Sequence, residues 1–487
     1  MKMRWFARGE GRKGPLALMP QRPAKLCRGA LCALPVLALL AASPNAIAQR
    51  AAGAPGPVPQ DRVSWNQLVV AQVDPAALRE TVARLVEFGT RHTASDTASA
   101  VRGIGAARRW VAQEFAQIAG RCGSCLTLVT PHEAVTGPRL PVATDVVDVV
   151  AIQQGSEEPG RVVLITAHLD SRVSDVMDNV HDAPGADDDA SGVAAVLECA
   201  RVLSQYHLAG TIVYGVLSGE EQGLYGGRIL AEYAKSRGWR VIADLNNDII
   251  GNTDGGDGVH DNTVVRVFSE GTRATETAQE AARRRYNGGE VDSPARNLSR
   301  YLTRLAQENL VNFRVEQVYR TDRYGRGGDQ VEFLEHGFPA VRLTEGHENY
   351  TRQHQDLRME SGVRYGDTID GVDFSYLAQV TRLNALALAN MARAPAPPAN
   401  VSIAGAVSPD TTIRWSAVTG AAAYRIYWRS TTAAQWQFHR DVLAADQGEV
   451  TLRNVPIDDW FFGVAAVNLE GFESPIVFPG AAGAFPP

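Results

Sequence analysis

A histidine and several carboxylates each stand directly after a β-rich apolar run in this chain. Three such runs cover residues 161–167, 211–217 and 241–245. A further acidic cluster at 185–192, Gly-Ala-Asp-Asp-Asp-Ala-Ser-Gly, leads into the helical pattern 191–203. Because the carboxyl ends of the strands form the ligand crevice of an open α/β sheet, four separate elements are expected to bring their polar residues to one edge. The polar residues that follow the three runs are His168, Asp170, Glu220, Glu221 and Asp248.

Oxygen and imidazole groups gathered without thiolates are typical ligands of zinc, manganese or cobalt. Converging carboxylates repel one another unless cations offset their charge. Each residue alone has a simpler interpretation, since an Asp before a helix is usually a cap and adjacent glutamates usually face solvent. Because the histidine and all of these carboxylates lie at strand ends, the sequence favours a metal site.

Strands alternate with helices through the middle of the chain. Apolar runs at 264–268 and 339–343 add further strands, and helical patterns cover 104–118 and 228–237. This alternation predicts an α/β fold, namely a three-layer sandwich around a mixed, mostly parallel sheet with helices on both faces.

The character of the sequence changes at the Pro-rich segment 394–399, which we expect to act as a linker or hinge. Short β-type runs with turn signals follow and predict a small all-β sandwich as a C-terminal domain over residues 400–487. Its aromatic pattern, which includes Trp415 and Tyr424, resembles that of a fibronectin type III domain. A contact to a surface or polymer is a role that fits such a module.

Residues 1–48 have the features of a secretory signal peptide. Eight bases and one acid accompany an apolar run at 31–42, and Ala-Ile-Ala at 46–48 gives a small-x-small cleavage pattern. The run is too short to span a bilayer, so we expect a secreted or periplasmic protein with no membrane span in the mature chain. Residues 49–65, which begin rich in Ala, Gly and Pro, are expected to form a linker or pro-segment.

The chain has 487 residues, of which 45% are apolar and 21% charged, and its formal net charge is −6. This composition indicates a globular protein with one large and one smaller domain, and it excludes a disordered chain or a collagen-like repeat. Without residues 1–48, 40 basic and 53 acidic residues remain, a net charge of −13. A chain this acidic is not expected to bind nucleic acid.

Cysteine usage agrees with export. After an export signal, the sequence C-G-S-C at Cys122 and Cys125 predicts a small local disulfide. Cys199 lies in an apolar helical pattern, where a packed core residue is expected.

Taken together, the motifs of residues 66–393 resemble those of the M28 family of zinc peptidases, and most closely those of the secreted bacterial leucyl aminopeptidases. The motifs are His168-Leu-Asp170, the cluster 185–192, Gly-Glu-Glu-Gln-Gly at 219–223, Asp248 and His354. The resemblance implies a pair of zinc ions, with Asp188 as the ligand shared by both. It implies that His168 and Asp248 complete the protein ligands of one ion, and that Glu221 and His354 complete those of the other.

The same resemblance assigns roles around the ions. Glu220 matches the general base, which takes the proton from a zinc-bound water acting as nucleophile and returns it to the leaving amine. Asp170 matches the carboxylate that holds the imidazole of His168 in its metal-binding tautomer. The bond between Asp188 and Asp189 is expected to be a cis peptide.

At one position the family motif allows two candidate ligands, and at another the sequence differs from the motif. His347 also follows a strand and is an alternative to His354 as the last ligand. The sequence has Asp329-Gln330 where many members of the family have an Asp-His pair, and Gln330 can neither carry a proton nor bind metal as a histidine does.

The resemblance therefore implies an exported di-zinc aminopeptidase that acts on peptides with a free N-terminus. A carboxypeptidase, a single-zinc glutaminyl cyclase and a non-catalytic binding protein on a peptidase scaffold stay open as alternatives. If the C-terminal module only aids attachment, a chain without residues 395–487 is expected to keep its activity on small amino-acid anilides.

Overall fold

The computed structural model describes residues 61–446 and 448–486, and all of them belong to one compact unit. The predicted signal peptide at 1–48 and most of the predicted linker at 49–65 lie outside the described residues.

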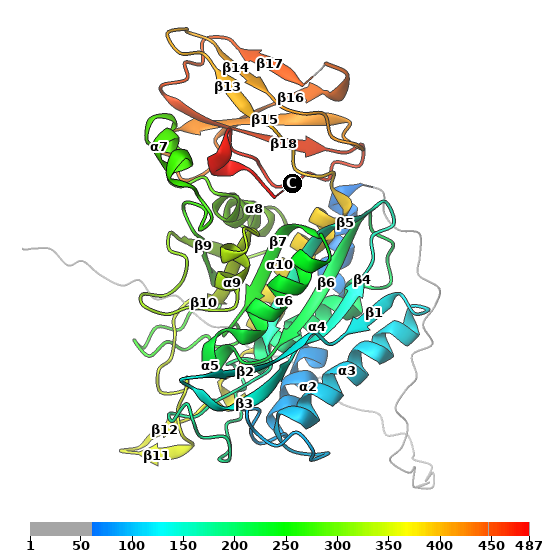
Figure 1. The fold of residues 1–487 in the computed structure, drawn as a ribbon, viewed down its shortest axis with the longest axis vertical. Helices are drawn as coiled ribbons and strands as arrows, with labels where there is room; N and C mark the ends of the chain where they lie inside the picture. Colours follow the sequence, from blue (N-terminus) through cyan, green and yellow to red (C-terminus); the bar gives the residue numbers. More distant parts are fainter. Residues whose placement is uncertain (1–60, 447, 487) are drawn as a thin grey trace, which may run out of the picture. The chain divides into compact units, whose positions relative to one another are not determined.

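An eight-stranded sheet with the order β1-β4-β6-β5-β7-β10-β8-β9 forms the centre of the larger domain (Figure 1). The pairs β5–β6, β5–β7, β7–β10 and β8–β9 are parallel, whereas β1–β4, β4–β6 and β8–β10 are antiparallel. The predicted mixed, mostly parallel sheet is thus confirmed. The strands are β1 Leu126–Val129, β4 Val149–Gln153, β5 Glu158–His168, β6 Gly210–Leu217, β7 Arg240–Asn247, β8 Val264–Phe268, β9 Arg314–Val318 and β10 Ala340–Glu345.

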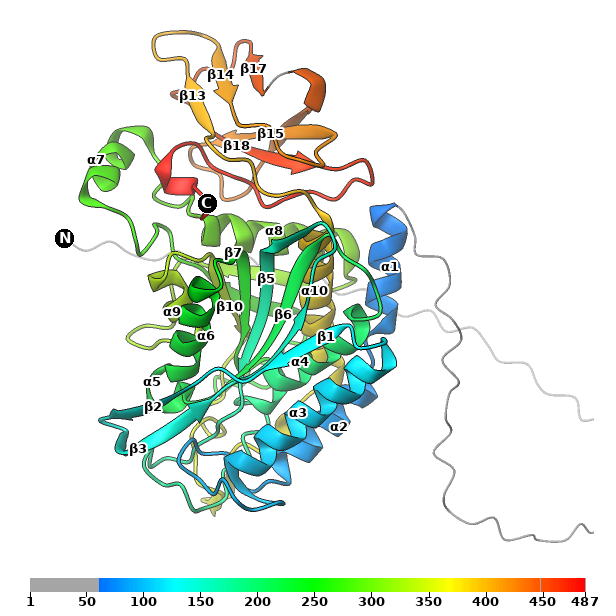
Figure 2. The same cartoon turned by 45° about the vertical axis from the view of Figure 1, so that its right-hand side comes forward.

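Helices cover both faces of this sheet, as the alternation of elements predicts (Figure 1 and Figure 2). On one face α1 (Arg62–Gln72), α2 (Pro75–Val86), α3 (Gly103–Arg121), α4 (Ala190–Leu203), α8 (Pro294–Asn309) and α10 (Phe374–Arg393) pack on one another and on the strands. On the other face lie α6 (Tyr225–Ser236) and α9 (Gln330–Glu335). No helix in the described part of the chain has the length and apolar character needed to cross a bilayer.

The folded domain begins earlier than the sequence motifs indicate. Helix α1 starts at Arg62, and Asp61 caps it by accepting a hydrogen bond of 2.9 Å from the backbone N–H of Ser64. Trp65 on this helix is fully buried. The predicted boundary at residue 66 therefore falls inside a packed helix, because a single cap and a short apolar stripe are weak signals in a sequence.

Two small antiparallel sheets make up the C-terminal module, in agreement with the predicted all-β class. One has the order β13-β14-β17 and the other β16-β15-β18, with Trp415, Tyr424 and Phe462 buried between them. The likeness to a fibronectin type III domain stays a prediction. The strands are β13 Ser402–Ala404, β14 Thr411–Arg414, β15 Ala423–Ser430, β16 Phe438–Leu443, β17 Glu449–Leu452 and β18 Trp460–Val467.

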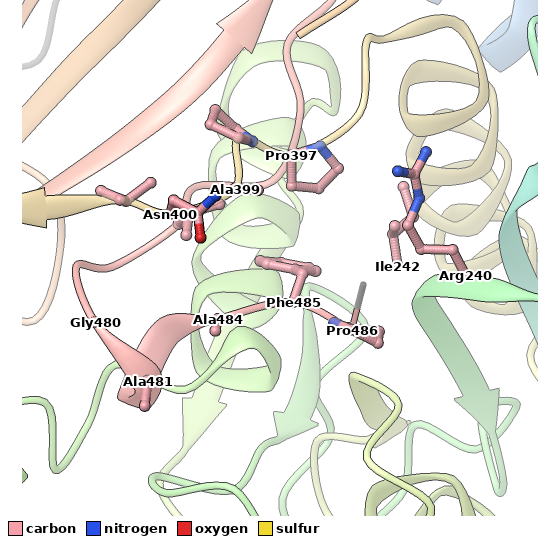
Figure 3. Close-up of a pocket in the computed structure, with 13 residues that line it drawn as sticks. Arg240, Ile242, Pro397, Ala399, Asn400, Gly480, Ala481, Ala484, Phe485 and Pro486 are labelled. Carbon is pink, nitrogen blue, oxygen red and sulfur yellow. The ribbon is translucent and has the colours of Figure 1, made fainter. Parts of the chain in front are cut away.

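The Pro-rich segment 394–399 packs against the protein instead of forming an exposed hinge, since most of its residues are buried. Figure 3 shows Pro397 of this segment and Phe485 of the C-terminal tail close to Ile242 of β7. Phe485 packs against both hydrophobic cores, and the fully buried Phe472 belongs to the core of the larger domain. The end of the chain thus contributes to both domains.

The prediction for the cysteines is confirmed. Cys122 and Cys125, directly after α3, form a disulfide with a Cα–Cα distance of 5.6 Å. Cys199 is a free, buried thiol within α4.

Candidate metal centre

The polar residues expected at the strand ends do meet at one edge of the sheet. His168 is the last residue of β5, and Asp248 directly follows β7. Glu221 lies in the one-turn helix α5 (Glu220–Gly223) after β6, and Asp188 lies just before α4. His354 comes from the loop between β10 and the short strand β11 (Arg358–Glu360).

These five residues form two groups that share Asp188. One group is His168, Asp188 and Asp248, the other is Asp188, Glu221 and His354, and in each the candidate ligand atoms lie within 4.8 Å of one another. Asp188 Oδ1 lies 3.1 Å from His168 Nε2, and its Oδ2 lies 3.0 Å from His354 Nε2. His354 Nε2 is also 3.1 Å from Glu221 Oε1. One carboxylate therefore presents its two oxygens to two different histidines.

The donor atoms fit a pair of zinc ions. His168 Nε2 and Glu221 Oε1 are buried and make no hydrogen bond, although each lies 3.1 Å from another candidate ligand atom. An orphaned buried polar atom is costly, and a cation between the ligands would satisfy both atoms. Two imidazoles and three carboxylates, with no thiolate, are a donor set that zinc accepts.

His168 is oriented by its neighbour, but not through the atom that the family resemblance implies. His168 Nδ1 lies 2.9 Å from the backbone carbonyl oxygen of Asp170, whereas the nearest carboxylate oxygen of Asp170 is 3.7 Å away. That contact to the ring Nδ1 leaves Nε2 facing the other ligands.

The carboxylate of Asp170 instead fixes the segment that carries the two glutamates. It accepts hydrogen bonds of 2.8 Å and 3.1 Å from the backbone N–H groups of Gly219 and Glu221, and one of 3.1 Å from the hydroxyl of Thr93. Gly219 has a φ of +82°, a conformation that glycine adopts without strain. In the structure the carboxylate of Asp170 thus positions α5 and its main chain contacts His168, and the role that the resemblance implies for this carboxylate stays a prediction.

The electrostatic environment keeps the shared ligand ionised. Burial raises the pKa of Asp188, but His168 and His354 beside it outweigh that effect and hold the pKa well below its ordinary value. Burial disfavours the charged form of His354, yet Glu221 and Asp188 raise its pKa to about 10. Both shifts show how strongly this cluster of carboxylates attracts positive charge.

Glu220 differs from the five residues above. It lines the cavity at the centre, and no hydrogen bond or ion pair within the described residues engages its carboxylate. Burial, together with the negative charges of Asp248 and Glu221, raises its pKa to about 8. A carboxylate that is not engaged and is made more basic by its surroundings suits proton transfer.

A buried arginine behind Asp248 is a residue that the sequence reasoning missed. Arg342, on β10, is fully buried, and its Nη1 lies 2.6 Å from Asp248 Oδ2. This pair leaves Asp248 Oδ1 directed at His168, 3.8 Å from Nε2. The available signal was a charged residue inside the apolar run 339–343.

The two open positions now have defined surroundings. His347 lies outside both groups, on the surface, where its Nδ1 is 2.9 Å from Asp257 Oδ2. Asp329 is buried and accepts a hydrogen bond of 3.1 Å from the backbone N–H of Gly227, while Gln330 Nε2 donates to Asp322. Gln330 therefore supports the loop that precedes α9 and does not reach the candidate ligands.

Comparisons with known proteins agree with this geometry. The model of peptidase family M28 matches residues 148–362, a range that contains all five candidate ligands and Glu220. A probable zinc metalloprotease of Leptosphaeria maculans is 43% identical over 427 residues, which cover 87% of this chain and 98% of that protein. A second one, from Pyrenophora teres f. teres, is 41% identical over 430 residues, 87% of this chain and 88% of that protein.

Among solved structures, LapA of Legionella pneumophila superposes with a TM-score of 0.50 at 18% identity, over 68% of this chain and 76% of LapA. At that identity the likeness concerns the fold alone. The fold, the family model and the two relatives lead to one conclusion, that this chain belongs to peptidase family M28.

Proposed function

We propose that this protein is a di-zinc aminopeptidase that removes N-terminal residues from peptides. The observation that carries the proposal is the placement of Asp188, whose two carboxylate oxygens lie 3.1 Å and 3.0 Å from the Nε2 atoms of two different histidines. A carboxylate shared in this way is the arrangement expected of a two-metal hydrolytic centre. The names of the curated relatives, probable zinc metalloproteases, support the choice of metal and reaction.

Five residues would hold the ions: His168 and Asp248 for one, Glu221 and His354 for the other, and Asp188 for both. When bound, zinc supplies Lewis acidity, which polarises a scissile carbonyl and lowers the pKa of water. The chain's own contribution is to fix the ligands through the backbone of Asp170 and the side chain of Arg342.

Glu220 is the residue that moves the proton. Its carboxylate lines the cavity without a partner of its own, so it is available to take the proton from the attacking water. The same carboxyl group then donates that proton to the nitrogen of the leaving amine, which balances the hydrolysis. The short helix α5 holds Glu220 next to the ligand Glu221, so the base lies beside the centre.

The size of the cavity favours an exopeptidase. It measures about 410 Å³, enough for a terminal residue and the bond beside it, and its lining includes Asp188, Glu220, Glu221, Asp248 and His354. An endopeptidase requires a groove that accepts an extended peptide on both sides of the bond.

Export completes the proposal. Supporting observations are the signal-like pattern of residues 1–48 and the disulfide between Cys122 and Cys125, a bond that persists in oxidising compartments. Attachment to a surface or polymer through the C-terminal module stays a prediction.

The test is a panel of aminoacyl-4-nitroanilides, free peptides and N-acetylated peptides, assayed on the purified protein before and after chelation. Cleavage restricted to substrates with a free amino group, abolished by chelator and restored by zinc, is the expected result. Cleavage of N-acetylated peptides from the C-terminus indicates a carboxypeptidase. One zinc per chain with cyclisation of N-terminal glutamine indicates a glutaminyl cyclase, and binding without turnover indicates a non-catalytic protein.

A further inference from the structure

Four arginines line the cavity above the candidate metal centre. Arg139 lies between β2 (His132–Gly137) and β3 (Leu140–Val147), and Arg172 lies in the loop after β5. Arg323 and Arg326 belong to the loop between β9 and α9. Three separate segments thus direct guanidinium groups to the same small cavity as Glu220.

Two of these arginines have no carboxylate partner within the described residues. Arg139 donates one hydrogen bond of 2.8 Å to the backbone carbonyl of Glu221. Arg172 donates only to backbone carbonyls of its own loop, those of Val173 and Ser174, at 3.0 Å and 3.1 Å. These bonds orient the guanidinium groups and leave their charge uncompensated.

The other two do have acidic neighbours: Arg323 pairs with Asp322 at 3.0 Å and lies 3.8 Å from Asp248, and both arginines lie near Glu348, which also binds a further arginine. Glu348 lies 2.7 Å from Arg266, 3.4 Å from Arg326 and 3.8 Å from Arg323. The Arg323 side chain is only 9% exposed, and its buried Nη1 makes no hydrogen bond. Arg326 is more accessible and uses only its Nη1, in contacts of 3.4 Å to Glu348 and Gln353, so within the described part of the chain its other guanidinium donors remain free at the cavity.

The lining is also poor in apolar surface. Among the described residues that line the cavity, Leu224 alone has a large apolar side chain. A site selective for leucine or phenylalanine needs an apolar pocket for the side chain, and this lining does not provide one. With zinc ions bound, the carboxylates at the base would be neutralised, and the arginines would give the cavity a positive potential.

We infer that Arg139, Arg172, Arg323 and Arg326 form a subsite for a carboxylate of the peptide substrate, next to the bond that is cleaved. This inference rests on the proposed peptidase function. Guanidinium groups bind carboxylates through paired, charge-assisted hydrogen bonds. The carboxylate belongs either to an acidic side chain next to the cleaved bond or to the C-terminus of a short peptide.

The experiment compares matched charged and neutral substrates on the full, zinc-loaded chain. The kcat/KM for glutamyl-4-nitroanilide is measured against that for glutaminyl-4-nitroanilide, and that for Ala-Ala against that for Ala-Ala-amide. In one of the two pairs we expect kcat/KM to be about tenfold to a hundredfold higher for the substrate that carries the carboxylate. This is the factor that charge-assisted hydrogen bonds provide. A preference in the first pair identifies the acidic side chain as the source, and a preference in the second identifies the C-terminus.

Arginine variants then show which side chains cause the preference for the charged substrate. Arg172→Gln and Arg326→Gln are expected to reduce it to less than about threefold, while Arg326→Lys, which keeps the charge, retains most of it. The matched control is Arg320→Gln, in the same loop as Arg326. Arg320 is exposed, stacks on the ring of Tyr324 and does not line the cavity, so the preference should be unchanged.

Calorimetry supplies a readout that does not depend on turnover. Glutarate is titrated into the zinc-loaded chain, with glutaramide as its uncharged counterpart, and the dissociation constant for glutarate should rise at least about tenfold in Arg172→Gln.

Two results separate the failure of this inference from that of the proposed function. If the enzyme cleaves leucyl-4-nitroanilide but shows no carboxylate preference in either pair, the inference is overturned and the proposed function stands. If no substrate with a free amino group is cleaved, the proposed function fails. The calorimetric titrations then test whether the arginines bind a carboxylate. Equal dissociation constants for glutarate and glutaramide overturn the inferred carboxylate subsite.

Discussion

Replacing Asp292 by alanine tests whether buried charges fasten the C-terminal module to the larger domain. Asp292 precedes α8 and is fully buried. Its Oδ1 accepts hydrogen bonds of 2.8 Å from Arg300 on α8 and 2.9 Å from Arg429 on β15, and its Oδ2 accepts a second one of 2.8 Å from Arg429. The side chains of both arginines are 1% exposed. One carboxylate therefore holds two buried cations, one from each domain.

The size of the effect follows from this burial. Removing the carboxylate leaves two buried guanidinium groups facing each other without compensation, which costs about 3–5 kcal/mol when one partner of a buried pair is lost. With a urea dependence of about 3 kcal/mol per M, that loss lowers the unfolding midpoint by about 1–1.7 M. An exposed pair is worth at most about 1 kcal/mol, so its loss should move the midpoint by no more than about 0.3 M.

Equilibrium unfolding in urea, followed by tryptophan fluorescence, measures the shift. Trp436 is a local reporter, since the guanidinium carbons of Arg300 and Arg429 lie 5.9 Å and 5.4 Å from its ring centre. The control variant is Asp441→Ala, which removes the half-exposed pair of Asp441 with Arg425 on the same module. Similar small shifts in Asp292→Ala and Asp441→Ala would refute the reasoning.

Four further predictions concern the centre and the fold. Glu220→Gln should keep its zinc content and lose turnover by about 10²–10⁴-fold, and near-normal turnover would exclude Glu220 as the base. Asp188→Asn should lower the occupancy of both metals, measured by elemental analysis, and retention of two zinc ions per chain would contradict the shared ligand. Burial raises the pKa of Asp244 from 3.8 to about 8, so the folded chain binds this proton more tightly than the unfolded chain. The contribution of Asp244 to stability should therefore fall as the pH rises from about 4 to 8, by up to about 1.4 kcal/mol per pH unit. In urea titrations Asp244→Asn should remove this contribution and make the pH dependence of stability more positive, and an unchanged pH dependence would contradict the prediction. Deleting residues 395–487 uncovers the buried charges of Asp292 and Arg300, so, contrary to the expectation from sequence alone, the truncated chain should unfold at lower urea and lose activity with its fold, and an unchanged midpoint would show that the module is separable.

The strands that position the site were predictable because they are buried on both faces. A parallel strand covered by helices on both sides is a continuous apolar run, and β6 is buried at every position. The polar residue at the end of such a run is therefore easy to place. The sequence alone therefore assigns His168, Glu221 and Asp248 to one sheet edge.

Other parts of the site could not be read from the sequence because their roles depend on distant contacts. Arg342 lies next to Asp248 only because β10 pairs with β7, a pairing between segments far apart in the chain. The arginines of the cavity come from three loops with no shared motif. The hairpin of β2 and β3, which carries Arg139, is mostly exposed and so lacks the apolar pattern that marks a strand.

The part played by Phe472 and Phe485 has a consequence for the order of folding. Phe472 is fully buried in the core of the larger domain, and Phe485 packs against both cores. Both residues follow α10, the last helix of the larger domain, which ends at Arg393, so that domain cannot complete its core until the C-terminal module has been synthesised as well. Folding to the final state must wait until Phe485 has left the ribosome, and a chain synthesised only as far as α10 would have an unfinished first domain that is open to proteolysis.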